Sequence, residues 1–305
     1  MQFYSAYTLC IGSDIPLLEL PAAQGPEDVT IQLMPAAPNE VRSIEWGDDP
    51  AGETRFRFAQ VGDFVLKSGR QVIVTPDPRA ELDLLRLYIQ GMILAAVLYQ
   101  RDHFVLHSSV VNVGGHAIAF IGHVGAGKSS LAAAFHSAGY GMVADDNAAI
   151  NFGNARPHVL PAFPSLKVYP EIAASLGYDS GAMVKLHHSQ VKRAQPVADG
   201  FSAVSLPLTC IFALDRDVPS GIQKLTPVES ITEMIRHSVP TRWGVSGNAQ
   251  HLKACAQLAR SLPVYRIRTF NELCEIPRIV RQIEEHLGGT LDISVARTAE
   301  RDNAA

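Results

Sequence analysis

The alternation of hydrophobic and polar residues predicts a small sheet at the start of the chain. Runs with a period of two are separated by glycine and proline turns, as in antiparallel strands. These strands are expected at residues 29–33, 55–58, 64–66 and 72–75. Lys67-Ser68-Gly69-Arg70 is typical of a hairpin turn, and prolines at 76 and 78 end the pattern. We therefore predict a β-rich N-terminal region over residues 1–78.

A helical pattern follows this region. From residue 79 to residue 100, apolar side chains recur every three to four positions and occupy both sides of the predicted helix. The longest apolar segment, Leu84 to Tyr99, contains Arg86 and Gln90 and is short for a membrane span. We expect a core helix, buried between the two parts of the chain.

The remainder of the chain alternates apolar runs of strand length with amphipathic helical stretches. This order predicts one α/β domain over residues 79–290, followed by a frayed tail over residues 291–305. Leu206 to Leu214 is apolar enough for a central buried strand. Other strands are expected at residues 104–106, 109–113, 116–121, 141–144, 148–152, 159–161, 165–169 and 264–267. Helices are expected at residues 130–137, 170–176, 228–237, 249–261 and 276–286.

A glycine loop lies between one of these strands and the helix after it. Gly122 to Ser129 fits the pattern G-x-x-x-x-G-K-[ST], whose backbone N–H groups cradle a polyphosphate at the positive end of a helix. Lys128 is expected to reach the β- and γ-phosphates of ATP, and the Ser129 hydroxyl to bind Mg²⁺. The predicted nucleotide-binding residues are Gly122, His123, Val124, Gly125, Ala126, Gly127, Lys128, Ser129 and Ser130.

Two adjacent aspartates end the next predicted strand. Asp145 and Asp146 follow Gly141 to Ala144, at the carboxyl end where open α/β sheets bind ligands. Neighbouring residues of a strand point to opposite sides, so one carboxylate could hold a metal ion while the other takes a proton from an attacking hydroxyl. The alternative is that Asp146 only caps a turn with Asn147.

These segments together carry a resemblance to a known family. His107 to Val111, the glycine loop and Val143 to Asp146 resemble the catalytic core of the bacterial HPr kinase/phosphorylase and related proteins. The similarity is good over residues 104–150 and extends to the rest in outline. It implies an α/β fold with a P-loop core of the HPr kinase/PEP carboxykinase type and a mixed sheet.

The resemblance also implies a chemistry, namely serine phosphorylation with Mg²⁺ and ATP. By position, Asp145 is the base that deprotonates the acceptor serine, Asp146 helps to arrange the site and to hold Mg²⁺ with Ser129, and His107 lies beside the pair. The implied catalytic residues are Asp145, Asp146, His107 and Lys128. The implied partner is a serine-bearing peptide or protein, and the classical relatives suggest a homo-oligomer.

The sequence departs from the classical enzymes after the aspartates. Where they carry a segment rich in glutamate, arginine and glycine, this chain has residues 164–171, with a lysine near the glutamate position. Phosphorylase activity and HPr as the acceptor therefore stay open. In outline the chain resembles the stand-alone HPr-kinase-like proteins encoded beside genes for ribosomally made peptides, some of which phosphorylate a lasso-peptide precursor.

The composition limits which binding partners and which cellular compartment are expected. A formal charge of −4 over 305 residues gives no general attraction for nucleic acid or an acidic membrane. The four cysteines form no C-x-x-C pair, which disfavours a zinc knuckle and a disulfide framework. The start of the chain does not have the pattern of a signal peptide. We expect a cytoplasmic protein that binds neither nucleic acid nor membrane.

Several residues and functions stay as alternatives. Lys192 and Arg193 could clamp phosphates or an acceptor, or belong to a solvated turn, and Arg242 beside Trp243 could touch either ligand or simply pack. His187 and His188 have no carboxylate or cysteine at ligand spacing, so no metal is expected there. In place of a kinase, the chain could be an ATP-binding regulatory or scaffold protein, or a P-loop ATP hydrolase.

Overall fold

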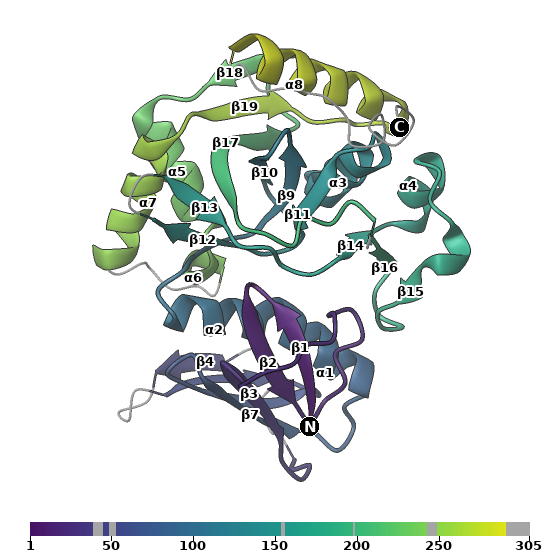
Figure 1. Cartoon of the computed structure of the whole chain (residues 1–305), viewed down its shortest axis with the longest axis vertical. Helices are drawn as coiled ribbons and strands as arrows, with labels where there is room; N and C mark the ends of the chain where they lie inside the picture. The colour runs from purple at the N-terminus through teal and green to yellow at the C-terminus, as the bar shows by residue number, and fades with distance from the viewer. Residues whose placement is uncertain (39–44, 49–52, 154–155, 198, 243–248, 291–305) are drawn as a thin grey trace. The chain divides into compact units, whose positions relative to one another are not determined.

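A computed structural model of the chain describes residues 1–38, 45–48, 53–153, 156–197, 199–242 and 249–290, and shows a mixed α/β protein (Figure 1). Its residues group into two compact units. The first contains residues 1–105 together with residues 185–190, and the second contains residues 106–184 and the described residues from 191 onward. The predicted tail, residues 291–305, lies outside the described residues.

The first unit is built on a mixed sheet in the order β1-β2-β3-β7-β6-β5-β4. Neighbouring strands are antiparallel except for β3, which runs parallel to both β2 and β7. The strands are β1 (Gln2–Ala6), β2 (Leu9–Ser13), β3 (Val29–Leu33), β4 (Glu45–Asp48), β5 (Thr54–Phe58), β6 (Gly62–Lys67) and β7 (Gln71–Pro76). The predicted β-rich start of the chain is confirmed, although β1, β2 and β4 were not expected.

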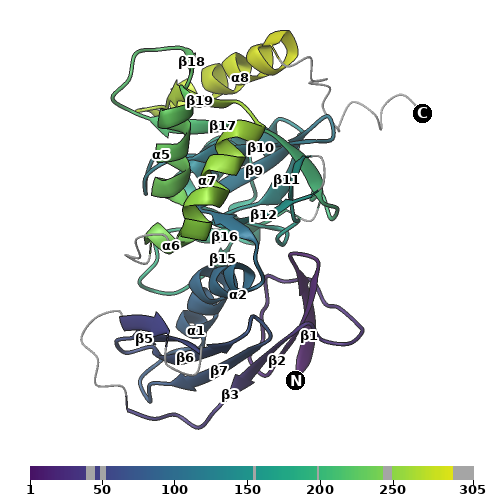
Figure 2. The same ribbon diagram turned by 90° about the vertical axis from the view of Figure 1, so that its left-hand side faces the viewer.

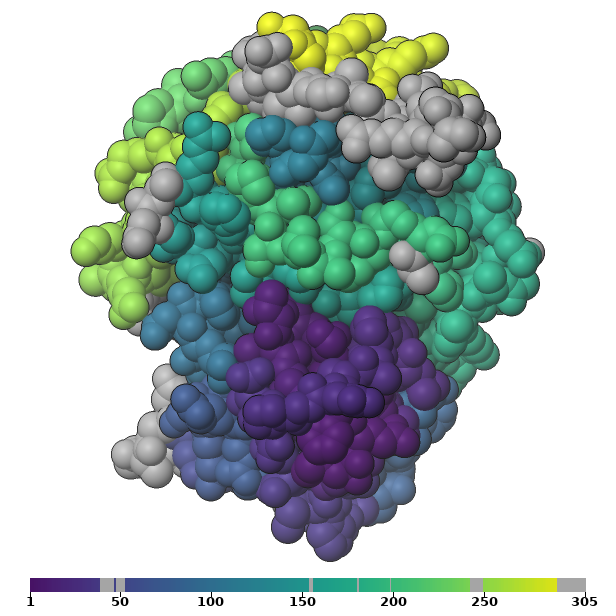
Figure 3. Space-filling model, in the orientation of Figure 1, coloured from purple at the N-terminus to yellow at the C-terminus, as the bar shows by residue number. Residues whose placement is uncertain are grey.

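The residues in the turns of two hairpins explain why some strands could be predicted from the sequence and others could not. Between β6 and β7, Ser68 and Gly69 adopt φ of 51° and 63°, and glycine suits that left-handed conformation. Between β1 and β2, Tyr7 and Thr8 adopt φ of 55° and 62° without any glycine or asparagine to indicate a turn. The purple surface in Figure 3 belongs to this first part of the chain, where Met1 and Ser5 are exposed.

The predicted apolar helix is present and belongs to the first unit. It consists of α1 (Leu82–Tyr88), a π-helical turn η1 (Ile89–Ile93) and α2 (Leu94–Gln100). Arg86 Nε donates to the Pro16 carbonyl at 2.8 Å, and the Tyr88 ring lies 4.4 Å from that of Phe58. The predicted boundary at residue 78 placed this helix with the second domain, whereas its contacts group it with the first sheet.

Length and composition alone would also allow this helix to cross a membrane. It is the one helix among the described residues that passes such a test, and half of its most apolar window is buried. Gln90, in the middle, is buried and its side-chain amide donates to Glu19 of the same unit. Burial of this kind is what a core helix requires.

The second unit is built on another mixed sheet, in the order β11-β9-β10-β17-β13-β12, with β19 on β17 and β18 on β19. Strands β10, β17 and β19 run parallel, while β9 is antiparallel to both β10 and β11. The strands are β9 (Ser108–Val113), β10 (His116–Ile121), β11 (Gly141–Ala144), β12 (Ala148–Phe152), β13 (Pro157–Val159), β17 (Leu206–Asp215), β18 (Ile222–Lys224) and β19 (Val264–Arg268). The strands predicted in this region are present, although the one expected at residues 159–161 lies at residues 157–159 and β18 was not expected.

Helices cover both faces of this sheet (Figures 1 and 2). On one side α3 packs against β9, β10, β11 and α8, and on the other α5 packs against α7. Phe120, Phe135 and Phe212 fill the core between the sheet and α3. The helices are α3 (Lys128–Ser137), α4 (Pro170–Ser175), α5 (Pro227–His237), α6 (Val239–Arg242), α7 (Ala249–Ser261) and α8 (Ile276–Thr290), with 3₁₀ turns η2 (Ser180–Ala182) and η3 (Leu273–Glu275).

Short strands complete the description. β14 (Ser165–Val168) pairs with β16 (Arg193–Pro196) in a small antiparallel ladder. The others are β8 (Phe104–Leu106) and β15 (Val184–Lys185), which lie at two of the three places where the chain passes between the units.

Candidate functional site

The glycine loop connects the end of β10 to the start of α3, as the sequence predicts. Gly127 precedes the first helical residue with φ of 100°. A Cβ atom there would meet the Phe270 ring at 2.8 Å, so both the conformation and the space require glycine. A Cβ atom at Gly122, where φ is 152°, would come within 2.9 Å of the Leu214 carbonyl. The loop is therefore held tightly at both ends.

The middle of the loop faces solvent. His123, Val124 and Gly125 are exposed, and the exposed fraction of Val124 is 86%. Lys128 is buried, and its ammonium group donates to the carbonyls of Gly122 at 2.8 Å and His123 at 3.2 Å. Ala126 and Ser130 are also buried, and Ser129 is half-buried. The lysine thus lies across its own loop, where a phosphate could attract its charge away from the two carbonyls.

Strand directions place the aspartates at the same edge of the sheet as this loop. Because β10 and β11 are both antiparallel to β9, they run parallel to each other, and their carboxyl ends meet at one edge. Ser109 of β9 lies opposite Phe120, near the end of β10, while the next residue, Val110, lies opposite Ala144 at the end of β11. The two segments that the sequence singled out therefore converge on the start of β9.

Asp145 is the more enclosed of the two carboxylates. Its side chain accepts a hydrogen bond from the Ser109 hydroxyl at 2.6 Å and another from the Lys167 backbone N–H at 2.8 Å. Only 5% of the residue is exposed. Asn147 closes the following turn with a backbone hydrogen bond to the Asp145 carbonyl. Asp145 is thus held rigidly by two neighbouring strands.

Asp146 is more accessible and is surrounded by positive groups. It adopts φ of 73°, and its carboxylate pairs with the Lys167 ammonium at 3.0 Å. His107 Nδ1 lies 2.7 Å from the Asp146 carbonyl and 3.3 Å from its carboxylate. Burial alone would raise the pKa of Asp146, but Lys167 and His107 outweigh it and hold this pKa well below its usual range. Asp146 is therefore ionised, as a metal ligand must be.

His237, which the sequence did not single out, connects the two halves of the site. The His107 backbone N–H donates to the His237 carbonyl at 2.9 Å, and the His237 ring meets that of His123 edge-on at 5.4 Å. Burial lowers the pKa of His237, and although the contact with Glu233 opposes this, the charge of the neighbouring Lys128 adds to the lowering. A neutral histidine thus lies between the glycine loop and the aspartates.

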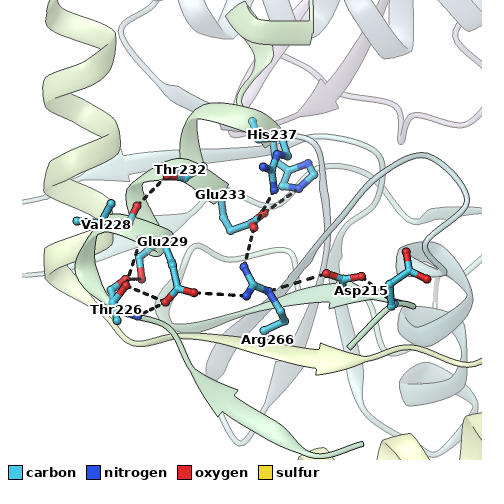
Figure 4. Close-up of polar contacts among 11 residues, drawn as sticks. Asp215, Thr226, Val228, Glu229, Thr232, Glu233, His237 and Arg266 are labelled. Atoms are coloured by element: carbon cyan, nitrogen blue, oxygen red, sulfur yellow. Dashed lines mark hydrogen bonds and ion pairs between the residues drawn. The ribbon is translucent and has the colours of Figure 1, made fainter. Parts of the chain in front are cut away.

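A charged network holds His237 in place (Figure 4). Glu233, one turn earlier on α5, contacts His237 Nε2 at 3.3 Å and Arg266 of β19 at 3.2 Å. Arg266 also pairs with Glu229 at 3.5 Å and with Asp215 at 4.0 Å. Burial would raise the pKa of Glu233, but the hydrogen bond to His237 and the charge of Arg236 lower it to about 2. The sequence could not predict this network, because it forms only when the fold brings β19 beside α5.

Two further residues brace the loop from the parallel strands. Arg216, after β17, donates from Nη2 to the Gly125 carbonyl at 2.8 Å. The Thr269 hydroxyl, after β19, donates to the Ala126 carbonyl at 2.7 Å. Each of these residues directly follows the last residue of a parallel strand. That position can be read from the sequence, but it indicates a site residue only when the order of the strands is known.

The remaining predicted residues lie away from these contacts or outside the description. Lys192 lies over the Tyr169 ring at 5.4 Å, and Arg193 is exposed on β16. Arg242 ends α6, and neither its side chain nor Trp243 is among the described residues. The described contacts thus join the glycine loop, the aspartates, His107, Lys167 and His237.

The arrangement has the donors and charges that a metal-bound polyphosphate needs. The loop amides and the Lys128 ammonium suit phosphate oxygens, while the Ser129 hydroxyl and the ionised Asp146 suit Mg²⁺, which prefers oxygen ligands. Lys167 currently neutralises Asp146. A bound Mg²⁺ would have to displace or share that ammonium group.

Comparisons with known proteins were made against families, sequences and structures. No family model matches the chain, and no curated protein sequence matches it. Among solved structures, it is similar to the HPr(Ser) kinase/phosphatase from Coxiella burnetii, with 12% sequence identity and a TM-score of 0.34, over 60% of this chain and 95% of that one. A TM-score of this size carries no weight for the chemistry of the site.

Proposed function

We propose that this protein is an ATP-dependent serine kinase, which transfers the γ-phosphoryl group of Mg·ATP to a serine hydroxyl of a peptide or protein. The observation that carries the proposal is the meeting of the glycine loop and the Asp145-Asp146 pair at one sheet edge, joined through His107 and His237. Phosphoryl transfer needs little more than positioning and charge stabilisation, which such an edge can supply.

The proposed roles follow the chemistry of each group. Loop amides and Lys128 hold the β- and γ-phosphates, and Ser129 and Asp146 hold Mg²⁺. Asp145 orients and deprotonates the acceptor serine, and His107 positions the aspartates. Asp145 accepts one hydrogen bond on each of its oxygens, so each oxygen keeps a further lone pair for the acceptor hydroxyl. Because Asp146 is the more exposed carboxylate, the competing assignment makes Asp146 the base and Asp145 the Mg²⁺ ligand.

The binding half of the proposal is tested by calorimetric titration of the full chain with Mg·ATP. Removing the ammonium group with Lys128→Ala should weaken binding at least tenfold, since the lysine is the main fixed charge of the loop. Lys224→Ala, on exposed β18, is the matched control and should bind as the wild type does. Equal affinity for all three proteins would argue against nucleotide binding in this loop.

The transfer half is tested by intact-mass analysis of small proteins and peptides encoded beside the gene, after incubation with Mg·ATP. A gain of one phosphate with the wild type, lost in Asp145→Asn while ATP still binds, supports Asp145 as the base. If phosphate transfer is lost in Asp146→Asn but not in Asp145→Asn, Asp146 is the base and Asp145 the Mg²⁺ ligand. Asp102→Asn, which alters an exposed aspartate of the first unit, is the control and should leave transfer unchanged.

Two other functions would give different results. A P-loop hydrolase would release ADP without any acceptor, and an ATP-binding regulatory or scaffold protein would bind ATP tightly without acceptor-dependent ADP release. The aspartate pair beside His107 favours transfer over both. All four cysteines are free, which supports a reducing cytoplasm as the proposed compartment.

A further inference from the structure

Two histidines and a glutamate meet in the first unit, apart from the candidate site. His187 and His188 belong to segment 185–190, and Glu81 immediately precedes helix α1. His187 Nε2 lies 3.6 Å from one Glu81 oxygen, and His188 Nδ1 lies 3.4 Å from the other. The sequence has no carboxylate at ligand spacing from this histidine pair, but the fold supplies Glu81 from far earlier in the chain.

His187 is the central member of this cluster. Only 5% of it is exposed, and its Nδ1 lies 2.7 Å from the Ser189 hydroxyl. Its Nε2 is buried and has no hydrogen-bond partner, although it faces Glu81. A buried polar nitrogen without a partner is unfavourable, and few are found in folded proteins. Such an atom, directed at a carboxylate but too far from it for a hydrogen bond, indicates that a ligand belongs between them.

We propose that Glu81, His187 and His188 bind a divalent transition-metal ion of the zinc type. All three candidate ligand atoms lie within 4.8 Å of one another. In a tetrahedral zinc site with bonds of about 2.0–2.1 Å, ligand atoms are separated by about 3.4 Å. The separations of 3.6 and 3.4 Å are close to this value but involve different oxygens of Glu81. The carboxylate therefore has to turn one oxygen toward both nitrogens, and the distance between the histidine nitrogens has to adjust.

The ligand set also selects the kind of metal. Two imidazoles and a carboxylate suit Zn²⁺, Ni²⁺ or Cu²⁺, whereas Mg²⁺ prefers oxygen ligands only. The site is thus chemically distinct from the magnesium site of the proposed kinase. Three protein ligands leave one tetrahedral position for water.

The surroundings of His187 allow a metal at Nε2. With the metal bound, Nδ1 must carry the proton and donate it to the Ser189 hydroxyl at 2.7 Å, in place of accepting from the Ser189 backbone N–H at 3.2 Å. A metal ion can bind both imidazoles in their neutral forms, although the two ring centroids are only 4.0 Å apart.

The test is a titration of the full chain, without an affinity tag, with Zn²⁺ and separately with Co²⁺. Wild type should bind one Zn²⁺, and His187→Gln/His188→Gln should lose this binding. His158→Gln, which changes a histidine of β13, is the matched control and should retain it. Bound Co²⁺ should show visible bands without the thiolate charge-transfer band that Cys10 or Cys274 would produce. Zn²⁺ should raise the Tm of wild type and not that of the double variant.

A second pair of variants removes the risk that the buried substitution disturbs folding. Glu81→Gln changes a side chain that is 60% exposed and should still abolish tight Zn²⁺ binding. Ser189→Ala should weaken it about 10- to 100-fold through loss of the outer hydrogen bond. Equal Zn²⁺ binding by wild type and Glu81→Gln, a thiolate band with Co²⁺, or no binding to wild type would each overturn the proposal.

Discussion

At the scale of single residues, the sequence indicated the candidate groups but not their partners. The glycine loop and the aspartate pair could be recognised because short motifs carry their own chemistry. The contacts of Asp146 with Lys167, and of Asp145 with Ser109, could not, because they depend on how β9, β11 and β14 are placed. His237 gave no signal at all, since a single histidine at a helix end is usually structural.

The glycine loop gives a prediction at this scale. Gly125 and Gly127 both have positive φ, 82° and 100°, but only at Gly127 would a Cβ atom meet a neighbour. Gly125→Ala should therefore lower the free energy of unfolding by only about 1–2 kcal/mol, from the left-handed backbone. Gly127→Ala should lower it further, because the Phe270 ring must also move. Urea denaturation measures both, and equal losses would mean that the contact with Phe270 is unimportant.

At the scale of elements, most of the structure could be predicted from periodicity. Most strands of the second unit and the helices α3, α5, α7 and α8 were expected, because each combines a clear period with glycine, proline or a cap at its ends, whereas β16 and β18 were not expected. Strands β1 and β2 were not, because the turn at Tyr7 and Thr8 lacks the usual residues. The π-helical turn Ile89–Ile93 also has no pattern that distinguishes it from an α-helix.

The network between α5 and β19 gives a prediction about acid stability. Glu233 has a folded-state pKa of about 2, below the value of about 4.3 expected in the unfolded chain. The unfolded state therefore binds the proton first, so this carboxylate stabilises the fold above pH of about 4.3, and the stabilisation is lost as pH falls toward about 2.

Glu233→Gln should remove this contribution. It should lower the free energy of unfolding at pH 7 by about 1.5–3 kcal/mol, the usual range for a hydrogen bond to a charged group, and flatten its decline between about pH 4.3 and pH 2. Glu285→Gln, at an exposed position of α8, is the control and should change neither quantity. Urea denaturation across this pH range checks the prediction. The same slope in Glu233→Gln and wild type would contradict it.

At the scale of the whole molecule, the division into units could not be read from the sequence. The proline-rich stretch near residue 78 looked like a boundary, yet the helix after it belongs to the first unit. Residues 185–190 belong to that unit as well, although the residues on either side of them belong to the second. Both assignments depend on contacts between segments far apart in the chain, which local patterns do not encode.

This division predicts how the first unit behaves alone. A polypeptide of residues 1–105 lacks segment 185–190 and should melt at a lower temperature than the same polypeptide with that segment attached by a flexible Gly/Ser linker. The segment brings buried Leu186 and His187 to the unit. A matched version with both residues changed to serine is the control. Circular dichroism melting measures the effect, and identical Tm values for all three would show that residues 1–105 are sufficient.

The late return of segment 185–190 also affects how the protein is made. The ribosome completes residues 1–105 first, but the last piece of that unit follows about 80 residues later, since residues 106–184 come between them. At about 5–20 residues per second, translation of the intervening stretch takes about 4–16 s. During that interval the newly made sheet has no access to His187 or Leu186. Folding of the first unit is therefore completed only after residues 106–184, the smaller part of the second unit, have been made, and before its larger part follows.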